Sequence, residues 1–357
     1  MTGAERFLAG CRGAAVDATP VWFMRQAGGS LPAYLALRKR HSVIEIARDA
    51  RLCSEVSAGA ADALGTDAAI MFADIMLLAE AMGVALELRS DGPHLEHPIR
   101  SLADVERLRV VDPAGDLGFI LEAIRATRLA VGSSAAVIGL AGGPFTMAAY
   151  LIEGGPSRDH AVAKTMLFAA PEVWHALVDR ITHATVAYVR AQVAAGAEAI
   201  QLFDSWAGSL GPADYDRAVR PWTARVLDAI RDAGVPSIHY AASGAALLER
   251  LADGADVVGV DAGQSLAVAR ARLGPDRAVQ GNLDPARLLA GPRAIESGVT
   301  AVLEAADGAP GHIFNTGGPI ARETSPDALR SIVAMVHDRS AREMAAAAGR
   351  HGQEVPS

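Results

Sequence analysis

Short apolar runs, each followed by a polar or glycine-rich turn and then by a longer stretch with helical spacing, recur along the whole chain. This alternation is typical of strand–helix units arranged around a parallel sheet. A parallel strand is buried on both faces, and the runs Ala136–Leu140 and Val257–Val260 are accordingly apolar throughout. The stretch Val173–Ala195 instead carries apolar residues at helical spacing. The pattern therefore predicts an α/β fold.

The number of candidate strands favours closure into a single (β/α)8 TIM barrel over an open sheet. Eight runs qualify: Val21–Met24, Ala68–Phe72, Ala136–Leu140, Ala199–Phe203, Ser237–Tyr240, Val257–Val260, Ala278–Gln280 and Ile313–Asn315. An open doubly wound sheet would carry a GxGxxG turn after its first strand, and no such turn follows Val21–Met24. We expect one barrel domain over residues 1–345, with Met82–Asp116 as an elaborated connection, and a flexible C-terminal tail over residues 346–357.

Composition narrows the class of protein further. Of the 357 residues, 51% are hydrophobic and 21% charged, which is enough apolar material for a large core. The net charge of -8 argues against a nucleic-acid or membrane-surface binder, so the cationic partners of any acidic ligand must be local. Cys11 and Cys53 are too few for a disulfide framework or a structural zinc site. Without a signal-peptide or membrane-span pattern, the sequence predicts a cytoplasmic protein.

Polar residues collect directly after the apolar runs, where the active site of a barrel is built. The first run leads into Arg25 and a pair of glycines, a combination that offers a guanidinium fork and exposed N–H groups to a carboxylate or phosphate. An ordinary surface arginine beside a flexible turn is the alternative. The basic cluster Arg38–His41 belongs either to this site or to a solvated helix face.

Three further side chains are candidates for the same site. Asp74 follows the second run in apolar surroundings, and such a carboxylate needs a facing partner, either a loop N–H or arginine or a ligand N–H. Tyr150 lies one to two turns into the helix expected after the third run, so its hydroxyl points into the barrel mouth or its ring packs in the core. Ser205 serves either as a ligand hydroxyl or as a helix N-cap.

Nucleophilic and metal chemistry have weaker support. The sequence contains no GxSxG elbow, and neither cysteine has a neighbour that would activate it. His239 and Asp261 end neighbouring candidate strands and could hold a divalent metal, but a third clear ligand is missing.

Five segments, in order and spanning roughly residues 5–340, together resemble the uroporphyrinogen decarboxylase family. They are Pro20–Gly28 (PVWFMRQAG), Phe72–Ile75 (FADI), Gly143–Ser157 (GPFTMAAYLIEGGPS), Gln201–Gly208 (QLFDSWAG) and Gln280–Pro285 (QGNLDP). The resemblance implies a single barrel, a homodimer, and a carboxy-lyase that needs no cofactor and no metal. It also implies the reaction, which is removal of the four acetate carboxyl groups of uroporphyrinogen to give coproporphyrinogen in tetrapyrrole (haem) biosynthesis.

The resemblance further implies roles for individual residues. Asp74 would bind the pyrrole N–H groups and stabilise the cation formed when a pyrrole carbon is protonated. Arg25 would hold a substrate carboxylate and assist proton delivery, so these two residues form the expected catalytic pair. The expected substrate-binding residues are Arg25, Gln26, Ala27, Gly28, Asp74, Tyr150, Ser205 and Arg38. A protonated pyrrole can accept the electron pair left by decarboxylation, and a buried aspartate stabilises that cation best where the dielectric constant is low.

Three positions depart from the family pattern. Gly29 replaces the second arginine of RQAGR, Gly318 replaces the histidine of NLGHG, and Leu35 stands where arginine is frequent. A charge-assisted hydrogen bond contributes about 1.5–3 kcal/mol, so the missing arginine alone corresponds to a roughly tenfold to hundredfold loss in binding or rate. Either another residue such as Arg322 substitutes, or the chain is a diverged paralogue that decarboxylates or binds a different, less anionic tetrapyrrole.

Two other classes remain as alternatives. Zinc-dependent methyltransferases of the wider superfamily use a His-x-Cys pair, whereas this chain has His239-Tyr240-Ala241 and no cysteine after Cys53. A non-enzymatic tetrapyrrole carrier would keep the pocket without turnover, and the retention of Asp74 and Arg25 speaks against it.

Overall fold

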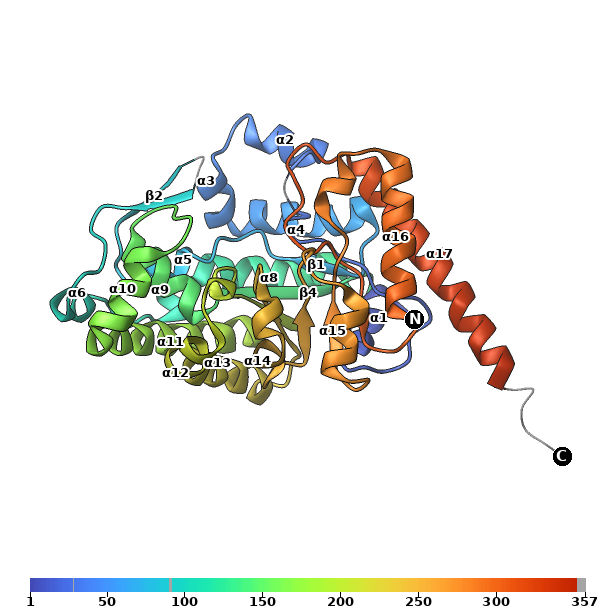
Figure 1. Cartoon of the computed structure of the whole chain (residues 1–357). Coiled ribbons are helices and arrows are strands. Elements are labelled where there is room, and N and C mark those ends of the chain that lie inside the picture. The colour runs from blue at the N-terminus through green and yellow to red at the C-terminus, as the bar shows by residue number, and fades with distance from the viewer. Residues whose placement is uncertain (28, 90–91, 352–357) are drawn as a thin grey trace.

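The chain folds as an α/β protein around a curled parallel sheet, as seen in the computed structural model, which describes residues 1–27, 29–89 and 92–351 (Figure 1). Seven strands pair in the order β1-β4-β5-β6-β7-β8-β9, and every pair is parallel. Their bounds are β1 Ala68–Ile70, β4 Ala136–Gly142, β5 Ala199–Phe203, β6 Ser237–Tyr240, β7 Val257–Gly259, β8 Ala278–Gln280 and β9 His312–Ile313. Each coincides with one of the predicted runs, so the α/β prediction is confirmed.

Two apolar clusters lie on the two faces of this sheet. The smaller cluster joins Ile70 of β1, Ile138 of β4 and Ile313 of β9 to Phe7 of helix α1 (Gly3–Cys11). Side chains from the first and last strands share one cluster only because the sheet curls around it. The larger cluster fills the space between the other face and the surrounding helices.

The first predicted strand, Val21–Met24, is wrong as a strand, because only Val21 forms a β-bridge, to Phe314. The Trp22 N–H still donates to the Phe314 carbonyl at 3.3 Å, but side-chain amides replace the backbone ladder at Phe23 and Met24. The Gln26 side chain accepts from the Phe23 N–H at 2.9 Å, and the Asn315 side chain accepts from the Met24 N–H at 3.1 Å. On its other side, the Val21 carbonyl accepts the Asp67 N–H at 2.9 Å, just before β1. The run therefore contacts both edge strands of the sheet.

Helices surround the sheet and connect consecutive strands. The long helix α11 confirms the helix predicted over Val173–Ala195, and its apolar side chains are buried against the sheet. The principal helices are α4 Ala50–Leu64, α8 Gly118–Val131, α9 Pro144–Glu153, α10 Ala161–Ala169, α11 Pro171–Ala194, α12 Pro212–Ala218, α13 Arg220–Asp232, α14 Leu248–Ala252, α15 Leu266–Leu273, α16 Pro292–Ala306 and α17 Pro326–His351.

The predicted connection Met82–Asp116 contains an antiparallel hairpin of β2 (Leu86–Arg89) and β3 (Gly92–Leu95), followed by α6 (Leu102–Glu106) and α7 (Pro113–Asp116). The first part of α17 packs against α16 and α4, and its later part extends away from the rest of the chain (Figure 1). It continues to His351, while residues 352–357 of the predicted tail lie outside the described residues. None of the helices in the described part of the chain is long and apolar enough to cross a membrane.

Candidate active site

Arg25, Asp74 and Tyr150 come from three different loops and helices, and the fold brings them into electrostatic contact. Burial and, to a lesser extent, the charge of Asp74 together raise the pKa of Tyr150 to about 12, although the charge of Arg25 acts in the opposite direction. The pKa of Asp74 is also lowered by Arg25. Asp74 follows β1 and Tyr150 lies in α9, after β4, so these residues gather at the carboxyl edge of neighbouring strands.

Asp74 is held by the first turn of the short helix α5 (Leu77–Ala81). One carboxylate oxygen, Oδ1, accepts the Met76 N–H at 2.8 Å, and the Asp74 carbonyl accepts the Leu77 N–H at 3.2 Å. Burial raises the pKa of the Asp74 carboxyl, which the Met76 N–H and Arg25 partly oppose. A loop N–H is thus the partner of Oδ1, whereas Oδ2 has no hydrogen-bond donor among the described residues and is free to meet a ligand.

The loop that carries Arg25 is strained and firmly braced. Arg25 is exposed and adopts a left-handed backbone conformation, with φ of 69°, which a residue with a side chain adopts at a cost of about 1–3 kcal/mol. Gln26 is fully buried, and its amide nitrogen donates to the Ala68 carbonyl at 2.7 Å while its oxygen accepts the Phe23 N–H. Ala27 is buried as well, and Gly28 lies outside the described residues.

The substrate contacts predicted for Gln26, Ala27 and Gly28 stay predictions. The structure gives Gln26 a bracing role, because both ends of its side chain bind backbone groups.

Tyr150 belongs to a stack of three rings at the end of α9. Its ring centroid lies 3.9 Å from that of Trp206, and His160 stacks on Trp206 at 4.3 Å. The stack leaves Tyr150 partly buried. Sequence reasoning overlooked Trp206, although the loop Asp204–Gly208 that carries it was recognised.

Ser205 and Asp204 follow β5 and differ sharply in environment. Ser205 is partly buried, and the short helix after it, Ala207–Ser209, has Trp206 at its N-cap, so the Ser205 hydroxyl does not cap that helix. The neighbouring Asp204 is fully buried, accepts two hydrogen bonds from Thr146, and has its pKa raised to about 6 by burial. Asp204 was not singled out from the sequence, and its signal would have been an acid directly after the predicted strand Ala199–Phe203.

Arg38 ends helix α2 (Pro32–Arg38), where its exposed guanidinium donates to the His41 carbonyl. Within the described residues, nothing links Arg38 to Asp74 or Tyr150 by a hydrogen bond or ion pair. Its role in substrate binding therefore stays a prediction, beside the alternative of a solvated helix face.

The two glycines that depart from the family pattern face identifiable neighbours. A Cβ at Gly29 would lie 3.5 Å from the Arg322 carbonyl oxygen, but the φ of 74° disfavours any side chain there. A Cβ at Gly318 would lie 3.9 Å from the Tyr240 hydroxyl, in ordinary van der Waals contact. Arg322 is exposed and makes no ion pair with another described residue. Its backbone nevertheless lies against the loop that carries Arg25.

His239 and Asp261 do not converge on a common point. The His239 Nδ1 bonds the Leu251 carbonyl at 3.0 Å, and burial lowers the pKa of the imidazole to about 4. The Asp261 carboxylate accepts the N–H groups of Gly244 and Gly263. Within residues 1–27, 29–89 and 92–351, no three His, Cys, Asp or Glu side chains are placed to share a metal ion.

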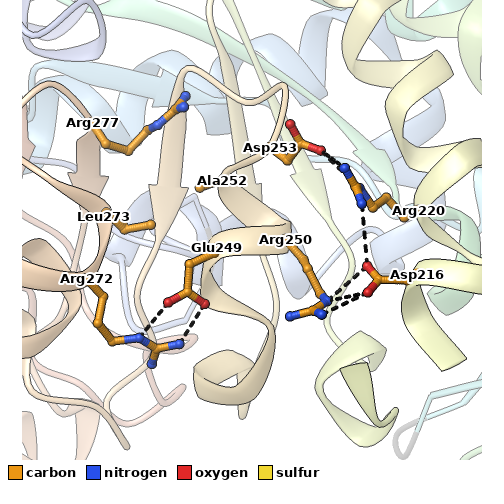
Figure 2. Close-up of a pocket in the computed structure, with 9 residues that line it drawn as sticks. All are labelled: Asp216, Arg220, Glu249, Arg250, Ala252, Asp253, Arg272, Leu273 and Arg277. Atoms are coloured by element: carbon orange, nitrogen blue, oxygen red, sulfur yellow. Dashed lines mark hydrogen bonds and ion pairs between the residues drawn. The ribbon is translucent and has the colours of Figure 1, made fainter. Parts of the chain in front are cut away.

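A charged hollow lies elsewhere, between α12, α13, α14 and α15 (Figure 2). Its carboxylates are already paired, since Glu249 binds Arg272 and Asp216 binds Arg250. Ala252 and Arg277 precede β7 and β8, so this hollow opens at the amino edge of the sheet, opposite Asp74. Each of its three carboxylates is paired with an arginine, and we assign the hollow no part in the site.

Fold and site together define a parallel α/β protein with an acid, an arginine and a tyrosine at the carboxyl edge of its sheet. The chain belongs to the uroporphyrinogen decarboxylase family, whose model matches residues 2–339. A uroporphyrinogen decarboxylase of Carboxydothermus hydrogenoformans is 42% identical over 94% of this chain and 97% of the relative. One of Sorangium cellulosum is 46% identical over 93% of this chain and 96% of the relative.

Among solved structures, a methyltransferase from Methanosarcina mazei is similar with a TM-score of 0.80 and 21% identity. The match covers 96% of this chain and 99% of the methyltransferase. At this level of identity the likeness concerns the fold alone.

Proposed function

We propose that this protein decarboxylates the four acetate side chains of uroporphyrinogen to give coproporphyrinogen, as a carboxy-lyase without cofactor or metal. Membership of the family supports the proposal, since relatives named uroporphyrinogen decarboxylase match over nearly the whole chain. The observation that carries it is the position of Asp74 after β1 and of Tyr150 after the neighbouring strand β4, where both side chains lie within range of the charge of Arg25.

In the proposed reaction, a proton is added to the pyrrole carbon next to the one that bears the acetate group. The bond between the acetate methylene and its carboxylate then breaks, and its electron pair neutralises the protonated ring as carbon dioxide leaves. A proton added to the methylene and one lost from the ring carbon complete the methyl group. Asp74 stabilises the transient cation, because a fixed charge acts strongly where water is excluded.

The substrate carries eight carboxylates, and this chain has a formal net charge of -8, so local cations must attract it. Arg25 is exposed at the mouth and would hold one carboxylate in a bidentate hydrogen bond. The partly buried hydroxyls of Tyr150 and Ser205 would contact other substrate side chains, and Arg38 would add a further cation.

We also propose that the curled sheet closes as a (β/α)8 barrel, with the Val21 segment in the place of the first strand. The contacts of Val21 with Phe314 and Asp67, on opposite edges of the sheet, support closure. Two consecutive side-chain hydrogen bonds also support closure. The Trp22 indole donates to Gln280 at 2.8 Å, and the Gln280 amide donates to Gln201 at 3.3 Å. These two hydrogen bonds join the Val21 segment to β8 and β5.

The family resemblance further suggests a homodimer in the cytoplasm. Sedimentation analysis of the purified protein tests the dimer, and fractionation of cells tests the location.

Anaerobic incubation of the purified protein with reduced uroporphyrinogen, followed by chromatography of the oxidised products, tests the activity. We expect coproporphyrin to accumulate and Asp74→Asn to slow its formation by about 100- to 1000-fold. Asp67 offers a matched control, because it is buried at the amino end of β1 and binds Arg6 and the Val21 N–H. Asp67→Asn should lower stability but not change the products. No turnover of either uroporphyrinogen isomer would refute the proposal.

The glycines at 29 and 318 support a second candidate, which is a diverged enzyme for a less anionic tetrapyrrole. This enzyme would bind and decarboxylate a partly decarboxylated porphyrinogen faster than uroporphyrinogen, and Asp74→Ala would abolish that activity. Equal binding by the parent protein and Asp74→Ala, with turnover by neither, would instead identify a carrier.

A further inference from the structure

Asp204 is a buried carboxylate that caps a helix belonging to a neighbouring strand. Helix α9 starts at Pro144, and its N-cap residue Gly143 offers no side chain to the free N–H groups of the first turn. Asp204 Oδ1 takes that place, accepting the Thr146 N–H at 3.0 Å and the Thr146 hydroxyl at 2.8 Å. A negative charge at this end of a helix is favourable, because the helix dipole is positive there.

Thr146 also forms a hydrogen bond with the loop after β5. The Thr146 hydroxyl accepts the backbone N–H of Trp206 at 3.1 Å, while it donates to Asp204. The Trp206 ring in turn lies on Tyr150, one turn further along α9. One carboxylate therefore connects the helix that carries Tyr150 to the loop that carries Ser205 and Trp206.

Glycine at 143 is required for this approach. A Cβ at Gly143 would lie 2.4 Å from both Cβ and Cγ of Asp204, a distance that real Cβ contacts do not show. The turn between β4 and α9 thus fits closely around the acid.

Stability alone does not account for an acid at this position. Asp204 is fully buried, and its second oxygen, Oδ2, has no hydrogen-bond partner among the described residues. The buried Tyr215 is close enough to feel the charge of Asp204, since its pKa is raised first by burial and then by that charge. Burying a charge with an unpartnered oxygen destabilises a fold, so the carboxylate is retained for what it positions.

We propose that Asp204 is a positioning residue that sets the Tyr150, Ser205 and Trp206 side of the substrate pocket through Thr146. The inference rests on the proposed function for its kinetic consequences, whereas its structural consequence can be measured without substrate.

The test compares three variants that differ in which hydrogen bonds of Thr146 remain. Asp204→Ala removes both hydrogen bonds, Thr146→Val removes those made by the hydroxyl, and Asp204→Asn keeps an acceptor oxygen in place. Near-ultraviolet circular dichroism reports the ring stack, and subtracting the spectrum of Trp206→Phe isolates the contribution of Trp206.

We expect Asp204→Ala and Thr146→Val to lose most of the Trp206 signal and to lower kcat/KM by about 10- to 100-fold, as displacements near 1 Å do. Asp204→Asn should keep the signal and stay within about threefold of the parent in kcat/KM. The double variant of Asp204→Ala and Thr146→Val should be no worse than Asp204→Ala alone, because both act through one contact.

The control Asp67→Asn separates positioning from general destabilisation, since it replaces a buried acid at the opposite edge of the sheet. This variant should leave the Trp206 signal intact. An unchanged Trp206 signal in Asp204→Ala, or additive effects in the double variant, would overturn the proposal. Should the parent protein turn over no porphyrinogen, the proposed function fails, and the circular dichroism still decides the positioning role.

Discussion

Replacement of Asp204 by asparagine should change how the stability of the protein depends on pH. Burial raises the pKa of Asp204 from 3.8 to about 6, so the folded state holds this proton more tightly than the unfolded state does. The stabilisation from this group is therefore complete below pH 3.8 and is lost as the pH rises towards 6. At about 1.4 kcal/mol per pH unit, the loss amounts to about 3 kcal/mol.

Asparagine has no proton to lose in this range, so Asp204→Asn removes this pH dependence. Urea unfolding at several pH values between 4 and 8 measures the free energy of unfolding of both proteins. Because part of the loss has already occurred at pH 4, we expect the variant to gain about 2.5 kcal/mol relative to the parent over this interval. Most of the gain should fall below pH 6.5, after which the difference levels off.

A non-titrating control shows whether the trend belongs to the carboxylate. Val258→Ala, in the buried strand β7, should destabilise the protein by the same amount at every pH. A difference between Asp204→Asn and the parent that stays constant from pH 4 to 8 would refute the reasoning, because it would mean that Asp204 titrates alike in the folded and unfolded chains.

Three further substitutions test the site. Asp74→Asn should lower kcat by about 100- to 1000-fold. The melting temperature should change little, since an oxygen still accepts the Met76 N–H. A rate within threefold of the parent would contradict the role of the charge. Arg322→Ala should raise KM for uroporphyrinogen about tenfold if Arg322 binds a substrate carboxylate, and an unchanged KM in steady-state assays would exclude that contact. Gly29→Arg should lower the free energy of unfolding by about 1 kcal/mol, because φ is positive there. The same substitution should lower KM for uroporphyrinogen. A rise in both stability and KM would show that the loop is arranged differently.

The order and class of the secondary structure could be read from the sequence. Apolar runs such as Ala136–Leu140 must be buried on both faces, and this requirement alone predicts strands in a parallel sheet. The same logic located the candidate loops of the site, because residues after parallel strands meet at one edge. Asp74 and Arg25 were found in this way, and the structure brings both together with Tyr150.

The first strand shows where this reasoning fails. Val21–Met24 has the apolar pattern of a strand, but Gln26 and Asn315 satisfy its backbone with side-chain amides, so only Val21 pairs as a strand residue. Apolar spacing measures burial, and it does not indicate which groups satisfy the buried backbone.

The sequence by itself determined the strand–helix alternation, the family, and the acid and arginine at the strand ends, since each depends on local pattern. Only the tertiary structure decided that Asp204 caps the helix of a neighbouring strand and that Trp206 stacks on Tyr150. Those contacts join loops that are more than fifty residues apart, and they exist only because the curled sheet places the ends of β4 and β5 side by side.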